Sequence, residues 1–97
     1  MKVVNWQVYI ISCSDNSLYT GITTDVERRF RQHSEGRGAK YFRGRQPIGI
    51  VYLESGHTRS SASKREIQIK SSSRIEKNIL LGRVIHSGDC NNRHLFR

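Results

Sequence analysis

Apolar and polar residues alternate loosely over residues 3–12, a spacing typical of a β-strand. One face of this segment carries Val4, Trp6, Val8 and Ile10. The sequence SDNS at 14–17 favours a turn, and 18–22 is again rich in residues that favour strands. Together the two segments predict an antiparallel hairpin.

A helix is expected directly after the hairpin, over residues 25–35. Thr24 and Glu27 have the T-x-x-E spacing of a capping box, in which side chains satisfy the first free N–H groups of a helix. Gly36 is a typical residue at a helix end.

Residues 36–47 are rich in glycine and basic residues, which favours a loop. A third strand is predicted over 48–53, and the sequence SGHTRS at 55–60 predicts a turn. A second helix is expected over 61–70. Its residues available for packing are Ala62, Ile67 and Ile69.

A second capping-box pattern, Ser73 and Glu76, predicts a third short helix that ends before Gly82. The order of elements is then β-β-α-β-α-α. Such an order predicts a compact α+β domain over residues 1–82, with a small three-stranded antiparallel-type sheet flanked by helices. The polar residues 83–97 are expected to form a C-terminal tail.

The charge of the chain points to a polyanionic partner. The 97 residues carry a formal net charge of +9, with a pI near 10.3. Such an excess repels itself unless a partner neutralises it, so nucleic acid is the first inference. The sequence has no apolar run of about 18 residues that would span a membrane, and no signal-peptide pattern. We therefore expect a cytoplasmic protein that does not act on membranes.

The cysteines do not indicate a disulfide framework, because there are only two, Cys13 and Cys90. His86, Cys90 and His94 are spaced four apart, which would align three metal ligands on a helix. The glycine, aspartate and asparagine residues between them disfavour a helix. A metal site is therefore not expected in this segment.

Five short motifs follow one another along the chain: QVY at 7–9, YTG at 19–21, TDVERRFRQH at 24–33, GAKYFRGRQP at 38–47 and KREIQIK at 64–70. In this order they resemble the GIY-YIG nuclease superfamily, specifically its small stand-alone, UPF0213-like members. The first two stand where the family has Gly-Ile-Tyr and Tyr-Ile-Gly. The other three are similar to the arginine helix, the basic loop and the glutamate helix of the family.

The resemblance implies roles for individual residues. Tyr9 and Tyr19 would direct their hydroxyls into one catalytic site, which Arg29 and His33 would face from the first helix. Glu66 would bind a single divalent metal ion, Mg²⁺ or Mn²⁺.

These residue types suit phosphodiester hydrolysis. A carboxylate-held Mg²⁺ keeps several waters and acts as a Lewis acid, so one glutamate can suffice. Arginine presents a planar fork that matches a phosphate. Tyrosine, with a free pKa of about 10, is a poor base unless nearby cations lower that pKa. We expect Tyr9 to be the base or to orient the water and Tyr19 to orient the phosphate, and the reverse assignment stays open.

Each residue also has a simpler interpretation. Tyr9 and Tyr19 can serve packing alone, and Arg29 can be a solvated helix charge. His33 can be a surface residue. Glu66 can pair with Lys70 at the favourable i,i+4 spacing.

The basic segments offer contacts to nucleic acid, with DNA favoured over RNA. The expected contact residues are Arg37, Lys40, Tyr41, Arg43, Arg45 and Lys70. Tyr41 and its neighbour Phe42 would stack on an exposed base, which favours recognition of structure or strandedness over sequence. The alternative for this loop is a solvated turn.

Two residues depart from the family pattern: Gln7 replaces the first glycine, and Thr20 replaces the isoleucine of the second motif. The longer side chain at position 7 is expected to narrow the site. The glycine that ends the second motif, Gly21, is expected to allow a close backbone approach.

The sequence thus supports a metal-dependent endonuclease that hydrolyses phosphodiester bonds in nucleic acid. The alternative is a catalytically silent nucleic-acid-binding module of the same fold. A basic adaptor between proteins would explain the charge but not the order of the motifs.

Overall fold

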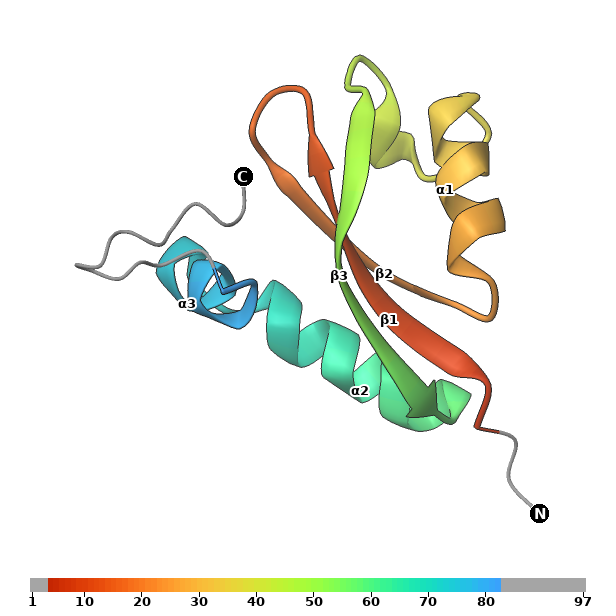
Figure 1. Cartoon of the computed structure of the whole chain (residues 1–97), viewed down its shortest axis with the longest axis vertical. Helices are drawn as coiled ribbons and strands as arrows, with labels where there is room; N and C mark the ends of the chain where they lie inside the picture. Colours follow the sequence, from red (N-terminus) through yellow and green to blue (C-terminus); the bar gives the residue numbers. More distant parts are fainter. Residues whose placement is uncertain (1–3, 83–97) are drawn as a thin grey trace.

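The protein is described by a computed structural model over residues 4–82, and its centre is a three-stranded sheet (Figure 1). Strand β1 (Trp6–Cys13) lies between the edge strands β2 (Leu18–Thr23) and β3 (Pro47–His57). Both edge strands pair with β1 in antiparallel fashion. The predicted hairpin is therefore confirmed.

The helices lie on both faces of the sheet (Figure 1). Helix α1 (Val26–Ser34) packs on one face and α2 (Arg59–Lys70) on the other. A one-turn 3₁₀ helix, η1 (Lys40–Phe42), interrupts the loop after α1, and α3 (Arg74–Leu80) follows α2. The predicted order β-β-α-β-α-α and the α+β fold class are confirmed.

Each face of β1 belongs to a separate core. Tyr9, Ile11 and Cys13 are buried against α1 and η1, whereas Val8 and Ile10 are buried against α2. Alternate side chains of a strand point to opposite faces, so a central strand that is covered on both sides needs apolar residues on both. This explains the nearly continuous apolar run of β1.

The cap of α1 differs from the prediction. Asp25, and not Thr24, is the N-cap residue, and its Oδ1 accepts a hydrogen bond from the backbone N–H of Arg28 at 3.1 Å. The Thr24–Glu27 capping box is therefore wrong. A short carboxylate caps a helix well and also favours the positive end of its dipole, which gives Asp25 the advantage.

The segment 55–60 is not the predicted turn. Strand β3 continues to His57, where it pairs with Trp6, and a register shift accommodates Gly56 at a φ of +78°. A bulge of this kind adds a residue to one strand without ending the pairing. Helix α2 then begins at Arg59, two residues earlier than predicted, because Thr58 and Ser61 form a capping box.

Helix packing confirms part of the expected core. Ala62 and Ile69 are buried seven residues, or two turns, apart. Ile67 lies on a different side of α2 and is 67% exposed, so its predicted packing role is wrong. The Ser73–Glu76 capping box of α3 is present as predicted.

Some expectations concern parts of the chain outside residues 4–82. The proposed tail 83–97 and the spaced residues His86, Cys90 and His94 lie there, so these expectations stay predictions. Within the described residues, no helix is long and apolar enough to cross a membrane.

Candidate active site

The two motif tyrosines lie side by side on the α1 face of the hairpin. Tyr9 of β1 is opposite Gly21 of β2, and Tyr19 is opposite Ile11, so the tyrosines are diagonal neighbours. Their ring centroids are 6.2 Å apart. The hairpin register therefore brings the two tyrosines together.

Gly21 is required for this arrangement. A Cβ atom at position 21 would lie 2.5 Å from the Tyr9 hydroxyl oxygen and 3.1 Å from the Tyr19 ring. The first distance is too short for unbonded atoms and the second is tighter than most real contacts, and the Tyr9 side chain that would have to move is buried. The expected close approach at this glycine is therefore present.

His33 is the third member of the cluster. Its Nε2 lies 3.0 Å from the hydroxyl oxygen of Tyr9, and its Nδ1 accepts a hydrogen bond from the backbone N–H of Ala39 at 3.3 Å. The side chain is 1% exposed, so the surface alternative for His33 is wrong. Gly38 makes space for the ring, because a Cβ there would lie 1.9 Å from Nδ1.

The protonation of His33 follows from these contacts. Burial, and then the charge of Arg29, lowers the pKa of His33 to about 4, so the ring is neutral at pH 7. Nδ1 is the acceptor, which places the hydrogen on Nε2. His33 therefore donates its hydrogen bond to the Tyr9 oxygen, and the hydroxyl hydrogen of Tyr9 is left for another acceptor.

Tyr9 also keeps its proton. Burial, and then the neighbouring Tyr19, raises the pKa of the Tyr9 hydroxyl well above its usual value, and the nearby Arg29 only partly opposes this. The sequence-based expectation of a lowered pKa does not hold for the protein alone. In this state Tyr9 is a hydrogen-bond donor.

Arg29 projects from α1 beside the tyrosines. Its Nη1 donates a hydrogen bond to Gln32 Oε1 at 2.9 Å, and its charge acts on both Tyr9 and His33. Within residues 4–82 no salt bridge involves Arg29. The guanidinium thus retains donors for an anion.

Glu66 lies on α2, and Lys70 lies between it and the ring of Tyr19. The Lys70 Nζ lies 3.0 Å from Glu66 Oε2 and 6.0 Å from the centroid of the Tyr19 ring. The alternative of an i,i+4 ion pair is therefore realised. It also shows that this carboxylate, with a side chain 21% exposed, already holds a cation beside the tyrosines.

The number of protein ligands near Glu66 indicates which metal ion this residue could hold. Among the described residues, no three His, Cys, Asp or Glu side chains are grouped closely enough to enclose a metal. A single carboxylate fits an ion such as Mg²⁺, which keeps most of its waters and also binds phosphate oxygens.

The comparisons with known proteins decide the family. The sequence model of the GIY-YIG catalytic domain matches residues 5–78. The chain belongs to the GIY-YIG family.

Relatives within this family carry the name UPF0213. A UPF0213 protein of Haloquadratum walsbyi is 60% identical over 70 residues, which cover 72% of this chain and 79% of that protein. A UPF0213 protein of Staphylococcus haemolyticus is 51% identical over 70 residues, covering 72% and 85%. This chain thus spans most of the length of both relatives.

Two solved structures are similar to this fold. The solution NMR structure of a UPF0213 protein from Bacillus halodurans is 43% identical, with a TM-score of 0.52 and coverage of 79% of this chain and 82% of that chain. The solution NMR structure of a protein from E. faecalis is 34% identical, with a TM-score of 0.55 and coverage of 92% and 99%.

The basic loop of this GIY-YIG domain divides into structural and outward-facing residues. Arg45 donates to Asp15 Oδ2 at 2.6 Å and to the Tyr41 carbonyl at 2.9 Å, and its guanidinium lies 4.1 Å from the Tyr41 ring centroid. Arg37 is paired with Glu35. In the described structure both arginines thus have carboxylate partners.

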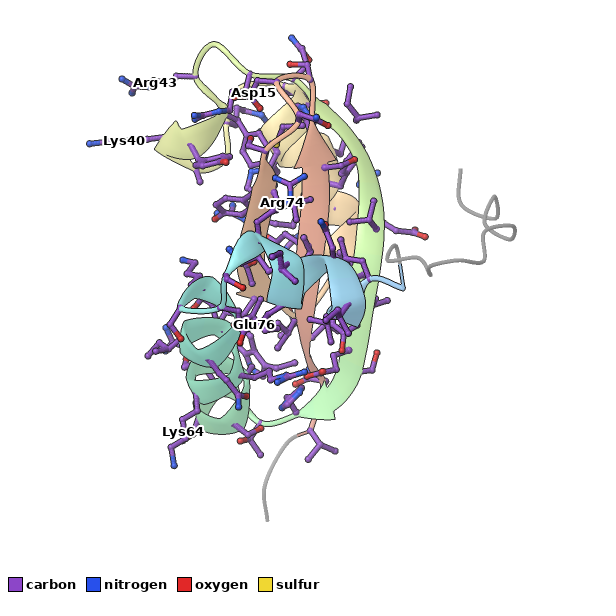
Figure 2. All side chains as sticks on the ribbon, turned by 90° about the vertical axis from the view of Figure 1, so that its left-hand side faces the viewer. Asp15, Lys40, Arg43, Lys64, Arg74 and Glu76 are labelled. Atoms are coloured by element: carbon purple, nitrogen blue, oxygen red, sulfur yellow. The ribbon has the colours of Figure 1, made fainter. Side chains whose placement is uncertain are left out.

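Lys40 and Arg43 point outward from this loop, and Lys64 points outward from α2 on the same side of the molecule (Figure 2). That side carries β2, the edge strand that includes Tyr19. The expected contacts at Lys40 and Arg43 stay predictions, and Lys64 is a further cation that the sequence did not indicate.

The two loop aromatics differ in exposure. Phe42 is 6% exposed and packs on the rings of His33 and Tyr19 at 4.3 and 4.9 Å between centroids. Its predicted stacking on a base is therefore wrong. Tyr41 is half-buried, and its ring centroid lies 5.1 Å from that of Tyr19.

The two departures from the GIY-YIG pattern have separate structural consequences. Gln7 Oε1 accepts a hydrogen bond from Val26 N at 3.1 Å and so satisfies a free N–H at the start of α1, and the expected narrowing of the site stays a prediction. Thr20 is 3% exposed on the α2 face, and its Oγ1 has no hydrogen-bond partner within residues 4–82.

Sequence reasoning missed Gly38 and Gln32. Gly38 makes room for His33, and Gln32 positions Arg29. The basic-loop motif contained Gly38, but its contact partner could not be read from the sequence. Gln32 lies three residues after Arg29, so the helical spacing was the available signal.

Proposed function

We propose that the protein is a divalent-metal-dependent endonuclease that hydrolyses phosphodiester bonds in DNA and selects structure or strandedness over sequence. The observation that carries this proposal is the guanidinium of Arg29, which has no carboxylate partner within residues 4–82 and lies beside the hydroxyl of Tyr9. A guanidinium of this kind, bordered by a neutral donor, suits a phosphate.

Each residue of the candidate site would have its own role in hydrolysis. Arg29 binds the phosphate with its planar fork. Tyr9, held by His33, donates a hydrogen bond to a phosphate oxygen or orients the attacking water. Tyr19 orients the phosphate from the edge strand. Lys70 would neutralise charge beside the phosphate, and its ion pair with Glu66 would have to open for that carboxylate to hold a metal ion.

Glu66 would hold a Mg²⁺ or Mn²⁺ ion, which, when bound, supplies positive charge to the phosphate and its leaving oxygen. Because the pKa of Tyr9 is raised, the water-orienting role suits this residue better than the base role in the protein alone.

One observation favours a second function. The ion pair between Lys70 and Glu66 occupies the carboxylate that a metal would need. A nucleic-acid-binding module of the same fold, without cleavage, would keep this ion pair.

A panel of substrates separates the two functions. Supercoiled plasmid, single-stranded DNA and RNA are incubated with the protein in Mg²⁺, Mn²⁺ or EDTA. We expect cleavage of DNA in either metal and none in EDTA. Binding of all substrates with cleavage of none, in every metal, would instead support the silent module.

A further inference from the structure

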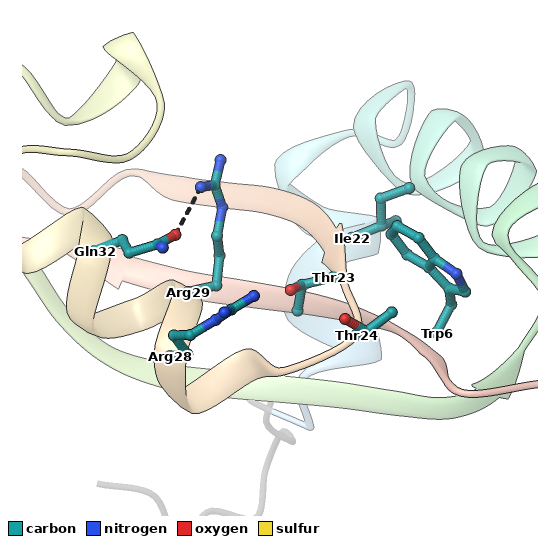
Figure 3. A pocket seen from close by; sticks show the side chains of 7 residues that line it. All are labelled: Trp6, Ile22, Thr23, Thr24, Arg28, Arg29 and Gln32. Atoms are coloured by element: carbon teal, nitrogen blue, oxygen red, sulfur yellow. Dashed lines mark hydrogen bonds between the residues drawn. The ribbon is translucent and has the colours of Figure 1, made fainter.

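A cavity of about 400 Å³ lies next to Arg29, within the range of about 300–1,000 Å³ typical of small-molecule sites (Figure 3). Its wall is made by residues from β1, β2, α1 and the β2–α1 connection. These residues are Trp6, Ile22, Thr23, Thr24, Arg28, Arg29 and Gln32.

The cavity continues the candidate active site along the edge strand. Gly21 packs on Tyr9, and the next two residues of β2, Ile22 and Thr23, line the cavity. Arg29 is common to both places. If a nucleic-acid strand places one phosphate on Arg29, its neighbouring nucleotide would therefore lie at this cavity.

The polar side of the cavity is built for an anion. Two guanidiniums, Arg28 and Arg29, line it, and no carboxylate from residues 4–82 does. Arg28 is exposed and takes part in no salt bridge within residues 4–82. Gln32 accepts from Arg29 through Oε1, which leaves its amide N–H groups for a ligand.

The opposite wall is apolar and aromatic. Trp6 and Ile22 form it, and Figure 3 shows the indole across the cavity from the two arginines. The guanidinium carbon of Arg59 lies 5.5 Å from the centroid of the Trp6 ring and adds positive charge on that side. An aromatic surface facing cations is the combination that holds a nucleobase together with its phosphate.

We propose that this cavity binds one unpaired nucleotide, with its base against Trp6 and a phosphate on Arg28. The ligand must be unpaired, because a base inside a duplex has both faces covered by its neighbours and cannot contact an indole. Its place next to the scissile phosphate rests on the proposed function, whereas the binding itself does not. The cavity would thereby make the protein selective for single-stranded or locally open DNA.

The fluorescence of Trp6 reports whether the cavity is occupied, because Trp6 is the only tryptophan of the chain. The protein in EDTA is titrated with a single-stranded DNA oligonucleotide of mixed sequence, and separately with the blunt duplex made from it. We expect the single strand to quench and shift the Trp6 emission. The duplex, although bound through its phosphates, should leave the emission close to that of the free protein.

Substitutions locate the contact, with binding followed by the anisotropy of a labelled single strand. Trp6→Leu keeps an apolar side chain for the neighbouring core but removes the aromatic plane, and should weaken binding about 5- to 150-fold, whereas Trp6→Phe should weaken it less. Arg28→Ala should lower the slope of log affinity against log salt by about 0.7. Arg31→Ala removes an equal charge from an exposed position of α1 outside the cavity and should keep the Trp6 quenching unchanged.

Two results would overturn the subsite. The first is single-stranded DNA that binds by anisotropy while the Trp6 emission stays constant. The second is folded Trp6→Leu that binds as tightly as wild type. Neither outcome depends on cleavage: a protein that quenches but never cuts refutes only the proposed nuclease, and one that cuts without quenching refutes only the subsite.

Discussion

The Tyr9 hydroxyl oxygen accepts a hydrogen bond from Nε2 of His33 at 3.0 Å, across the interface between the sheet and α1. Because Nδ1 of the same ring accepts from the backbone at Ala39, this contact fixes the direction of the hydrogen bond. Tyr9 is therefore the centre of the candidate site: its hydroxyl oxygen accepts from His33, and its O–H group can still donate a hydrogen bond.

Tyr9→Phe tests that contact. It removes one hydroxyl and opens no large cavity, so the fold should persist, and cleavage should fall by about 10²- to 10⁴-fold. Tyr52→Phe is the matched control, because the Tyr52 hydroxyl bonds Glu54 on β3, away from the site. Equal rates for wild type and folded Tyr9→Phe would remove Tyr9 from the chemistry.

His33 should make stability depend on pH. Its pKa is about 4 in the folded protein and about 6.5 when unfolded. The unfolded chain therefore takes up a proton first, so the stability from neutral His33 is complete above about pH 6.5 and is lost as the pH falls toward 4. We expect the Tm to decrease over this window, measured by circular dichroism.

The His33→Gln variant should show a flatter dependence of Tm on pH over the same window. A folded His33→Gln protein with the same slope as wild type would refute the lowered pKa of His33.

Gly21→Ala should damage both the fold and the site. The added methyl group would lie 2.5 Å from the Tyr9 oxygen, and overpacking of this kind lowers the free energy of unfolding by about 1–3 kcal/mol. Gly49→Ala is the control, since a Cβ there meets no atom within 4 Å. Urea denaturation measures both, and a Gly21→Ala protein as stable as Gly49→Ala would contradict the packing described.

The local features of the fold were predictable and the distant contacts were not. The hairpin and the cap of α3 follow from spacings of a few residues, such as Ser73 to Glu76. Gln7 caps α1 across 19 residues, and Tyr9 meets His33 across 24. No local pattern encodes such partners, because they depend on how α1 settles on the sheet.

The same difference between local patterns and distant contacts explains which predictions about the site were right and which were wrong. The motifs placed Tyr9 and Tyr19 on one face, since the hairpin register follows from alternation. They did not reveal that Phe42 would be buried or that Arg45 would pair with Asp15, because the path of the loop depends on the packed rings beneath it. The catalytic and metal-binding roles stay predictions.

Thr20→Val should stabilise the protein. The buried Oγ1 of Thr20 has no partner within residues 4–82, so replacing the hydroxyl by a methyl group removes an uncompensated desolvation penalty. We expect a gain of about 1 kcal/mol, or about 4–8 °C in Tm for a domain of this size. Thr23→Val is the contrast, because its hydroxyl accepts from Asp25 N at 3.2 Å, and it should lose stability. A Thr20→Val protein that melts below wild type would show that the hydroxyl has a partner.

The central claim is that Glu66 serves cleavage and not merely the ion pair with Lys70. The most direct measurement compares plasmid cleavage in Mg²⁺ or Mn²⁺, and oligonucleotide affinity in EDTA, for wild type, Glu66→Gln and Glu27→Gln. Glu27→Gln removes the same charge from an exposed position of α1. We predict that folded Glu66→Gln binds at least as tightly as wild type and does not cleave, while Glu27→Gln cleaves normally. Cleavage by folded Glu66→Gln at the rate of wild type would contradict the account.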